Sequence, residues 1–191
     1  MIALDASQFV LFDTVVQWFS PWQHFFSHSK VAQTGIMFVH LAGLLFAGGF
    51  AVAADRTVLR ATSRRISDAE GARAAYLRTE TLETLHTIHR PVIIGLTFVI
   101  LSGLAMALGD VETFATSPVF WSKMGLFVLL SVNGLWLMRT ETALRLRARA
   151  DESGQAPALV DPLWGRLRFT AFASMILWTV TLLAGTILAN S

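Results

Sequence analysis

The chain alternates long apolar runs with shorter polar segments that are rich in arginine. The first run, residues 31–54, contains no acidic or basic side chain, and its one ionisable residue is His40. At about 1.5 Å per helical residue, this run is long enough to cross a hydrocarbon core of about 30 Å. Three further apolar runs cover approximately residues 88–108, 119–138 and 169–189. The pattern predicts an all-α integral membrane protein with four transmembrane helices.

The segment before the first span has a different pattern. Residues 6–19 are too few to span a membrane, but their apolar side chains recur on one helical face: Phe9, Phe12, Val16 and Phe19. We therefore expect an amphipathic helix lying in the membrane interface. Ser20-Pro21 predicts the start of a second helical stretch over residues 22–30, because proline is favoured at the first helical position. Residues 1–30 are interpreted as an outer interfacial segment and residues 31–191 as the transmembrane domain.

Starting signals also precede the later helices. Ser67 and Glu70 have the spacing of a capping box, which predicts a helix beginning there and leading into the second span. Ser117-Pro118 and Asp161-Pro162 predict the starts of the helices that carry the third and fourth spans. Residues 109–117 are expected to form a polar loop.

Composition agrees with a membrane class and charge placement predicts an orientation. The chain is 54% hydrophobic and 15% charged, against about 25% charged in soluble domains. Thirteen of the 15 lysines and arginines lie in the connections between spans one and two and between spans three and four. The positive-inside rule places both connections in the cytoplasm and both termini outside. The basic residues thus act as a topology signal and as contacts for membrane lipids, so no nucleic-acid partner is expected.

Short connections predict that successive spans are antiparallel neighbours, so the expected architecture is a four-transmembrane-helix antiparallel bundle. Small residues on the spans would allow the helix backbones to approach closely, for example Gly43 and Ala47 on the first span and Gly95 and Gly103 on the second.

His40 is the leading candidate for chemistry, because an ionisable side chain inside a membrane span suggests a functional site. It shares a helical face with Gly43 and Ala47. From the rise per residue, His40 lies about 5 Å outward of the middle of its span, and Ser102 on the second span and Thr181 on the fourth fall at nearly the same level. We therefore expect His40, Ser102 and Thr181 to form a polar layer within the bundle. The histidine could be satisfied by a hydroxyl, could ligate a tetrapyrrole or metal, or could relay protons.

Two histidine pairs are candidate metal ligands. His24 and His28 are four residues apart before the first span, and His86 and His89 are three apart near the start of the second. Either spacing can place two imidazoles on one helical face, as half of a zinc or copper site. The second pair could equally form an interfacial polar cluster. A single haem held by His40 and His89 is not expected, because their depths differ by almost 20 Å, estimated as ~1.5 Å per residue.

Other chemistry is restricted by what the chain lacks. There are no cysteines, which excludes disulfides, iron–sulfur clusters and thiolate zinc sites. The sequence contains no phosphate loop and no HExxH motif, and no nucleophile–base arrangement can be recognised. Asn133 on the third span is expected to form an interhelical hydrogen bond, and Lys123 to extend toward the outer surface.

The segments FVHLAGLLFAGG and FWSKMGLFVLLSVNGL resemble small bacterial four-span proteins related to the copper-resistance D (CopD) membrane protein. Those proteins have a histidine early in the first span and a third span that begins with lysine after a tryptophan. The matching positions are His40, Trp121 and Lys123. The resemblance implies a four-helix fold, haem or copper handling, and a bacterial inner (plasma) membrane location.

Three functions stay open at this point. The first is an accessory subunit, not an enzyme by itself, of a larger membrane redox or photosynthetic or respiratory assembly, with His40 next to or ligating a tetrapyrrole such as haem, or a metal. The second is a CopD-like carrier of copper or haem that uses His24, His28 and His40. The third is a cytochrome b-like, quinone-linked oxidoreductase. Expected partners are other membrane subunits or further copies of the chain.

Overall fold

The computed structural model describes residues 6–63, 71–152 and 162–188, and every element in these ranges is an α-helix. Two helices precede the first connection, α1 (Ala6–His28) and α2 (Lys30–Ala61). They are followed by α4 (Gly71–Gly109), the short α5 (Val111–Thr116), α6 (Pro118–Glu152) and α7 (Leu163–Leu188). The predicted all-helical class is confirmed for these residues.

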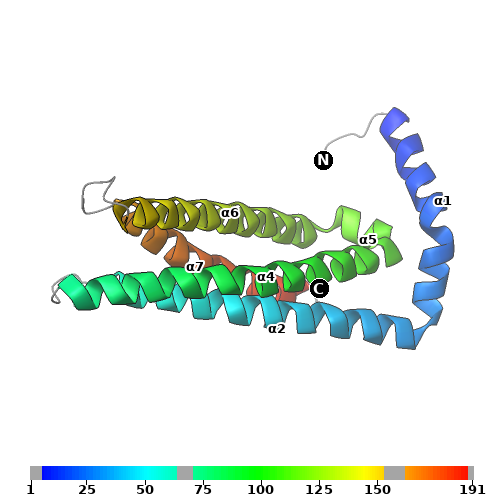
Figure 1. Cartoon of the computed structure of the whole chain (residues 1–191). Coiled ribbons are helices and arrows are strands. Elements are labelled where there is room, and N and C mark those ends of the chain that lie inside the picture. The colour runs from blue at the N-terminus through cyan, green and yellow to red at the C-terminus, as the bar shows by residue number, and fades with distance from the viewer. Residues whose placement is uncertain (1–5, 64–70, 153–161, 189–191) are drawn as a thin grey trace.

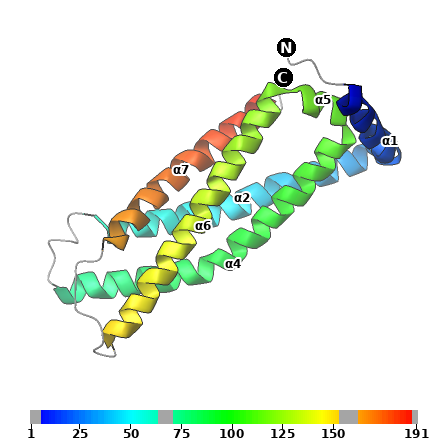
Figure 2. The ribbon, with the colours of Figure 1, turned by 90° about the horizontal axis from the view of Figure 1, so that it is seen from above.

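Four helices are long and apolar enough to cross a membrane, as the sequence predicted: Lys30–Ala61, Ala75–Gly109, Pro118–Ala150 and Leu163–Ile187. Each extends beyond its apolar run. The extension is clearest in α2 and α6, where the arginine-rich segment continues the helix rather than ending it. We call the end of the molecule near α5 the α5 end, and the opposite end, where α2 and α6 end, the arginine end (Figures 1 and 2). The half of α2 and of α6 that leads to this end carries Arg56, Arg60, Arg139 and Arg145.

The four long helices do not pack equally. The most extensive contacts join α2 to α4 and α6 to α7, and α2 also lies against α7. Helices α4 and α6 touch over a much shorter length. Figure 2 shows α6 crossing α4 near the arginine end, with the two helices diverging toward α5.

Glycine allows the closest of these approaches, between α2 and α4. A Cβ built on Gly95 would lie 2.9 Å from the Ala47 Cβ, and one built on Gly43 would lie 3.1 Å from the Gly95 carbonyl oxygen. No larger side chain fits there without moving a backbone, so Gly43, Ala47 and Gly95 set the distance between the two helices, as predicted for small residues.

Two apolar clusters of buried side chains occupy the interior formed by the described helices. The larger lies toward the arginine end and includes Val58, Leu85, Leu167 and Ala171. The smaller consists of Ala47, Leu130 and Trp178. Gly48 makes room for Trp178, since a Cβ on that glycine would stand 3.4 Å from the indole ring.

The N-terminal segment differs from its prediction. Helix α1 continues through Ser20 and Pro21 to His28, so no second helix begins at Ser20-Pro21. The break comes instead at Ser29, whose side chain caps α2 by accepting a hydrogen bond from the Ala32 amide. Proline inside a helix costs one backbone hydrogen bond, and here the helix tolerates that loss.

Helix α1 is attached to the α5 end of α4. The Trp22 indole donates a 3.0 Å hydrogen bond to the Ala105 carbonyl oxygen. Phe26 packs on Gly109, where a Cβ would lie 2.3 Å from its ring. Phe19 and Trp22 line a shallow apolar groove with Leu101, Leu104, Ala105 and Leu108.

Of the other predicted helix starts, the one at Ser117 is confirmed, and two lie outside the described residues. Ser117 caps α6 as predicted, its hydroxyl accepting from the Phe120 amide. The expected loop over residues 109–117 instead contains α5, which Asp110 caps through a hydrogen bond from the Thr113 amide. The predicted caps Ser67–Glu70 and Asp161 lie outside the described residues.

Candidate functional site

His40 projects from α2 toward α4 and is 8% exposed. Its Nδ1 atom lies 3.0 Å from the Ser102 hydroxyl oxygen and 3.1 Å from the Val99 carbonyl oxygen. The Ser102 hydroxyl donates its one proton to backbone carbonyls of its own helix, chiefly that of Phe98. Both groups facing Nδ1 therefore offer lone pairs, and Nδ1 must carry the imidazole hydrogen.

This hydrogen placement leaves a lone pair on the other ring nitrogen of His40. Nε2 is buried and has no hydrogen-bond partner among the described residues. Buried polar atoms in proteins are nearly always paired. A histidine that donates one N–H to a backbone carbonyl and presents the other nitrogen bare has the arrangement of a metal-ligating imidazole.

Gly103 explains how the ring comes so close to α4. A Cβ at this position would stand 3.2 Å from the His40 Cε1 atom, so a larger residue would push the imidazole away. The glycine of α4 and the hydroxyl of Ser102, one residue before it, together hold the ring in one orientation.

Thr181 on α7 was predicted to lie at the depth of His40. Gly48, two helical turns along α2 from His40, packs on Trp178, which is less than one turn before Thr181, so Thr181 lies closer to the level of Gly48 than to that of His40. Thr181 is 4% exposed, and its hydroxyl has no partner among the described residues. Two buried polar atoms on different helices, Nε2 of His40 and Oγ1 of Thr181, are thus left without partners. Of the predicted polar layer, the contact between His40 and Ser102 is present, and Thr181 forms no hydrogen bond to either of these residues.

The third span contributes Lys123, which is partly buried. Its charge lies within electrostatic range of the His40 imidazole. A Cβ on Gly185 of α7 would stand 3.5 Å from the Lys123 ammonium nitrogen. We call His40, Ser102 and Lys123 the His40 site, and Thr181 is a separate buried hydroxyl on α7.

The chemistry open to the His40 site follows from its donors. It offers one imidazole lone pair, one hydroxyl oxygen and one ammonium group. No cluster of three or more His, Asp or Glu side chains suited to a metal ion occurs in the described ranges. The His40 site can supply one axial ligand to a metal held by a macrocycle, or hydrogen bonds to a polar organic ligand, but not a full coordination shell.

The other histidines are placed differently. The rings of His24 and His28 stack on exposed α1 with centroids 4.3 Å apart, and His28 Nδ1 bonds the His24 carbonyl oxygen. His86 is exposed, whereas His89 faces α6. His86 and His89, which were predicted as a pair, therefore lie in different surroundings.

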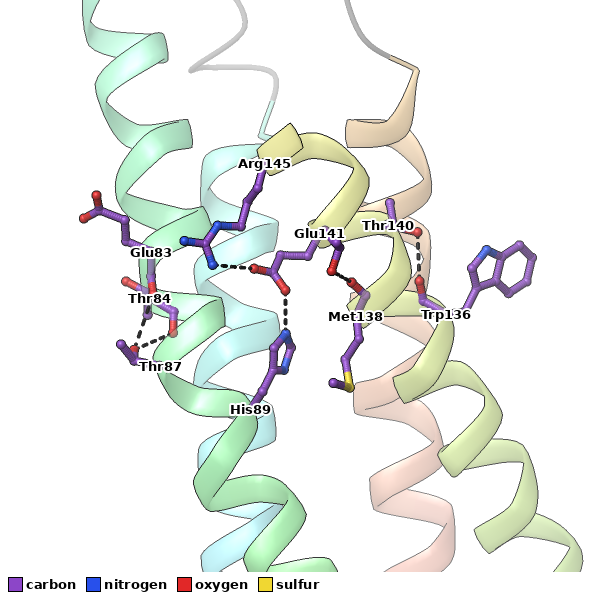
Figure 3. A network of polar contacts seen from close by, with 10 residues as sticks. Glu83, Thr84, Thr87, His89, Trp136, Met138, Thr140, Glu141 and Arg145 are labelled. Carbon is purple, nitrogen blue, oxygen red and sulfur yellow. Dashed lines mark hydrogen bonds and ion pairs between the residues drawn. The ribbon is translucent and has the colours of Figure 1, made fainter. Parts of the chain in front are cut away.

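The partner of His89 is Glu141, a residue that sequence reasoning did not single out. His89 Nε2 lies 2.7 Å from Glu141 Oε2, and Arg145 Nη1 lies 3.4 Å from Oε1 of the same carboxylate (Figure 3). The carboxylate is buried although the pair lies near the arginine end. One available signal was its spacing: Glu141 stands four residues before Arg145, on the same helical face.

Asp55 was also missed, because it lies just beyond the apolar run 31–54. Its side chain is 2% exposed and interacts with the Ser174 hydroxyl, while Oδ2 has no hydrogen-bond partner in the described chain. The sequence pattern did contain a signal for the burial of Asp55. Asp55 follows Ala54 on the face that carries His40, Gly43 and Ala47, all of which are buried.

Asn133 forms the interhelical bond that was predicted for it. Its amide nitrogen donates a 3.0 Å hydrogen bond from α6 to the Thr170 carbonyl oxygen on α7. That carbonyl lies one turn from the Ser174 side chain, so α6 and α7 are joined by a polar contact close to the level of Asp55.

No protein-family model, curated protein or solved structure matches the chain. The resemblance to the copper-resistance D proteins therefore rests on its motif residues. Of these, His40 is buried and Lys123 is partly buried, whereas Trp121 is exposed and its indole donates to the Ala115 carbonyl oxygen in α5.

Proposed function

We propose that this protein is a small integral membrane subunit, without catalytic machinery of its own, that holds a tetrapyrrole at His40 within a larger membrane redox assembly. In this proposal the four long helices cross the membrane as an antiparallel bundle and α1 lies in the interface. The arginine end faces the cytoplasm and the α5 end, with both termini, faces outward.

The single observation behind this proposal is the state of the His40 ring. Nδ1 is bonded to the Val99 carbonyl and the Ser102 hydroxyl, and Nε2 is bare and buried. A histidine held only for packing would leave an unpaired nitrogen in a low-dielectric interior, which costs about 1–3 kcal/mol. Ligation by Nε2 removes that cost.

A tetrapyrrole suits the His40 site better than a bare copper ion. A free cation would need several protein ligands, and the described residues offer it one imidazole. It would also stand near the positive charge of Lys123, which repels it. A macrocycle brings four of its own ligands and needs only axial donors from the protein.

The route of entry lies between α4 and α6. These neighbours share much less contact than α2 with α4 or α6 with α7. Because Nε2 is covered in this structure, binding requires α4 and α6 to separate at the α5 end, where Figure 2 shows them already diverging. The contact between His89 and Glu141 lies toward the other end and can act as the pivot.

The test is the visible absorption spectrum of the purified protein, before and after addition of haemin. We expect a Soret band typical of histidine-ligated iron in the wild type and in His86→Ala, the matched control on an exposed histidine. In His40→Ala the band should be lost or shifted. A band that His40→Ala leaves unchanged would exclude His40 as the ligand.

Other results would favour the remaining functions. Stoichiometric copper that is lost in His24→Ala and His28→Ala would indicate the carrier. Reduction of a quinone by the isolated protein would indicate the oxidoreductase. The role as a subunit is tested by purification in a mild detergent, where larger membrane proteins should accompany the chain and should stay with it in His40→Ala.

A further inference from the structure

We propose that Asp55 is a proton-binding site at the contact between α2 and α7, and that loss of its proton loosens this contact. The inference concerns a part of the bundle away from the His40 site. Fifteen residues, or about 22 Å of helix, separate Asp55 from His40 on α2. Proton binding at Asp55 therefore does not depend on what His40 holds.

The Asp55 carboxyl group is enclosed and incompletely paired. Its side chain is 2% exposed, and its Oδ2 atom has no hydrogen-bond partner in the described chain. The polar group that it meets is the Ser174 hydroxyl on α7. A hydroxyl donates a single proton, whereas an ionised carboxylate offers about four acceptor sites. The contact with Ser174 therefore leaves most of the hydrogen-bonding capacity of an ionised Asp55 unused.

Apolar side chains flank this contact. Val58 lies one turn after Asp55 on α2, and Ala171 lies one turn before Ser174 on α7. Both belong to the larger apolar cluster, in which Leu85 of α4 is also fully buried. A carboxylate in such surroundings loses its hydration without replacement, whereas the neutral acid loses far less. The packing around Asp55 thus favours the form that carries a proton.

No ion pair among the described residues keeps Asp55 ionised, because both of the ion pairs found there involve Glu141. On α4 and α6, the interior groups His89 and Glu141 bond each other, and Arg145 bonds the same carboxylate. Arg78 of α4 lies over an indole ring of α7. Helix α1 lies at the α5 end, away from Asp55 (Figure 1). Exposed charged or titratable side chains on the same half of the long helices include Arg56, Glu83, His86, Arg90, Arg139 and Arg168.

Proton uptake on folding follows from these surroundings. In water an aspartate is ionised above about pH 4, so at neutral pH closure of the bundle would bury a charge unless the carboxyl takes up a proton. Neutralisation is the usual response of an unpaired buried carboxyl. The closed contact then holds one more proton than the separated helices. Its stability falls as the pH rises, by up to about tenfold in the equilibrium constant for each pH unit.

The position of Asp55 allows its proton to exchange with water. The residue directly follows the apolar run 31–54 and stands six residues, or about 9 Å of helix, before the end of α2 at Ala61. Arg56, the next residue, is exposed. Separation of α2 from α7 near the arginine end opens Asp55 to water, where it releases its proton, and the ionised carboxylate then opposes closure.

The first measurement is the infrared spectrum of the full-length protein at neutral pH, because a protonated carboxyl has a C=O stretching band that an ionised carboxylate lacks. We expect this band in the wild type and its loss in Asp55→Asn. The controls Glu83→Gln, at an exposed acid, and Glu141→Gln, at the other buried acid, should keep it. In Ser174→Ala the band should move to higher wavenumber, because the carboxyl loses the hydrogen bond from the hydroxyl.

The second measurement is the hydrogen exchange of α7 amides around Ser174 as the pH is raised. Exchange is itself catalysed by base, so the wild type is compared with Asp55→Asn at each pH. Once the infrared band has begun to disappear, wild-type amides should exchange up to about tenfold faster than those of the variant for each further pH unit. Amides of α4 beside Gly103, near the α5 end, should exchange equally in both proteins.

Three results would overturn the proposal. Absence of the band from the wild type at neutral pH would mean that Asp55 is ionised and paired with a cation. A band that neither Asp55→Asn removes nor Ser174→Ala moves would belong to another carboxyl group. A band that disappears at high pH, with equal exchange in the wild type and Asp55→Asn, would show that the proton does not control the contact between α2 and α7.

Discussion

His89 on α4 and Glu141 on α6 approach to 2.7 Å between Nε2 and Oε2, and they join the two neighbouring long helices that otherwise touch least. Arg145 takes the second carboxylate oxygen, so both oxygens of Glu141 have a partner. Figure 3 shows this cluster between the two helices, with Glu83 on the same helix as His89 pointing elsewhere. The contact fixes where α4 and α6 cross and leaves their α5 ends free to diverge.

Removing this contact should loosen the crossing. Glu141→Ala leaves His89 without its partner and should lower the free energy of unfolding by about 2 kcal/mol, the scale of a hydrogen bond to a charged group. Thermal unfolding in detergent measures the loss. The control Glu83→Ala removes an exposed carboxylate of α4 and should have little effect. If the double variant of His89→Ala with Glu141→Ala loses the full sum of the two single losses, the two residues are not coupled.

The packing of α2 on α4 should not tolerate a methyl group at position 95. Gly95→Ala places a Cβ 2.9 Å from the Ala47 Cβ, so the helices must separate despite the better helix propensity of alanine. We expect a lower unfolding temperature and less folded protein in size-exclusion chromatography. The control Gly49→Ala meets nothing within 4 Å and should be neutral or slightly stabilising. A Gly95→Ala variant as stable as Gly49→Ala would show that this close approach is absent in the protein.

Asp55 should be replaceable by its neutral isostere. Asp55→Asn keeps the shape and can keep the contact with Ser174, while it removes a buried group whose Oδ2 has no partner in the described chain. Burial of an unpaired carboxylate is costly, so the variant should unfold at the same or a higher temperature than the wild type. The control Glu80→Gln changes an exposed acid on α4. A marked loss in Asp55→Asn alone would indicate that the carboxylate binds an ion or water that stabilises the fold.

The attachment of α1 should depend on one of its two neighbouring tryptophans. Trp22→Ala removes the indole that donates to the Ala105 carbonyl and that lines the groove with Leu101 and Leu104. Amides of α1 should then exchange with deuterium faster, because the helix detaches from α4 more often. Trp18→Ala, at a position 81% exposed, is the matched control and should leave exchange unchanged. The same exchange rate in both variants would contradict the observed attachment.

The orientation can be tested by labelling, because the chain has no cysteine of its own. A single cysteine is introduced at Glu112 in α5 or at Arg60 near the arginine end, both exposed positions. In intact cells, a membrane-impermeant maleimide should label Glu112→Cys, whereas Arg60→Cys should react only after the membrane is permeabilised. The reverse result would invert the orientation and place the His40 site near the inner surface.

Several features could be derived from single residues and their close neighbours in the sequence. The four apolar helices follow from runs of side chains that lipid favours, and the start of α6 follows from Ser117 and Pro118. The burial of His40 follows from the small residues that share its face. Pro21 was misleading because its local preference for a helix start lost to the continuity of α1.

What the sequence determined by itself is the set of membrane-length helices and the polar residues that they carry, since both depend on neighbours within a few turns. The tertiary structure decided which of these residues meet. Ser102 and Val99 bond His40, and Glu141 bonds His89, across separations of more than fifty residues. Such pairs depend on how each helix is rotated about its axis and where it crosses its neighbour. Close contacts such as Ala47 on Gly95 set those two quantities, and the pattern along one helix does not.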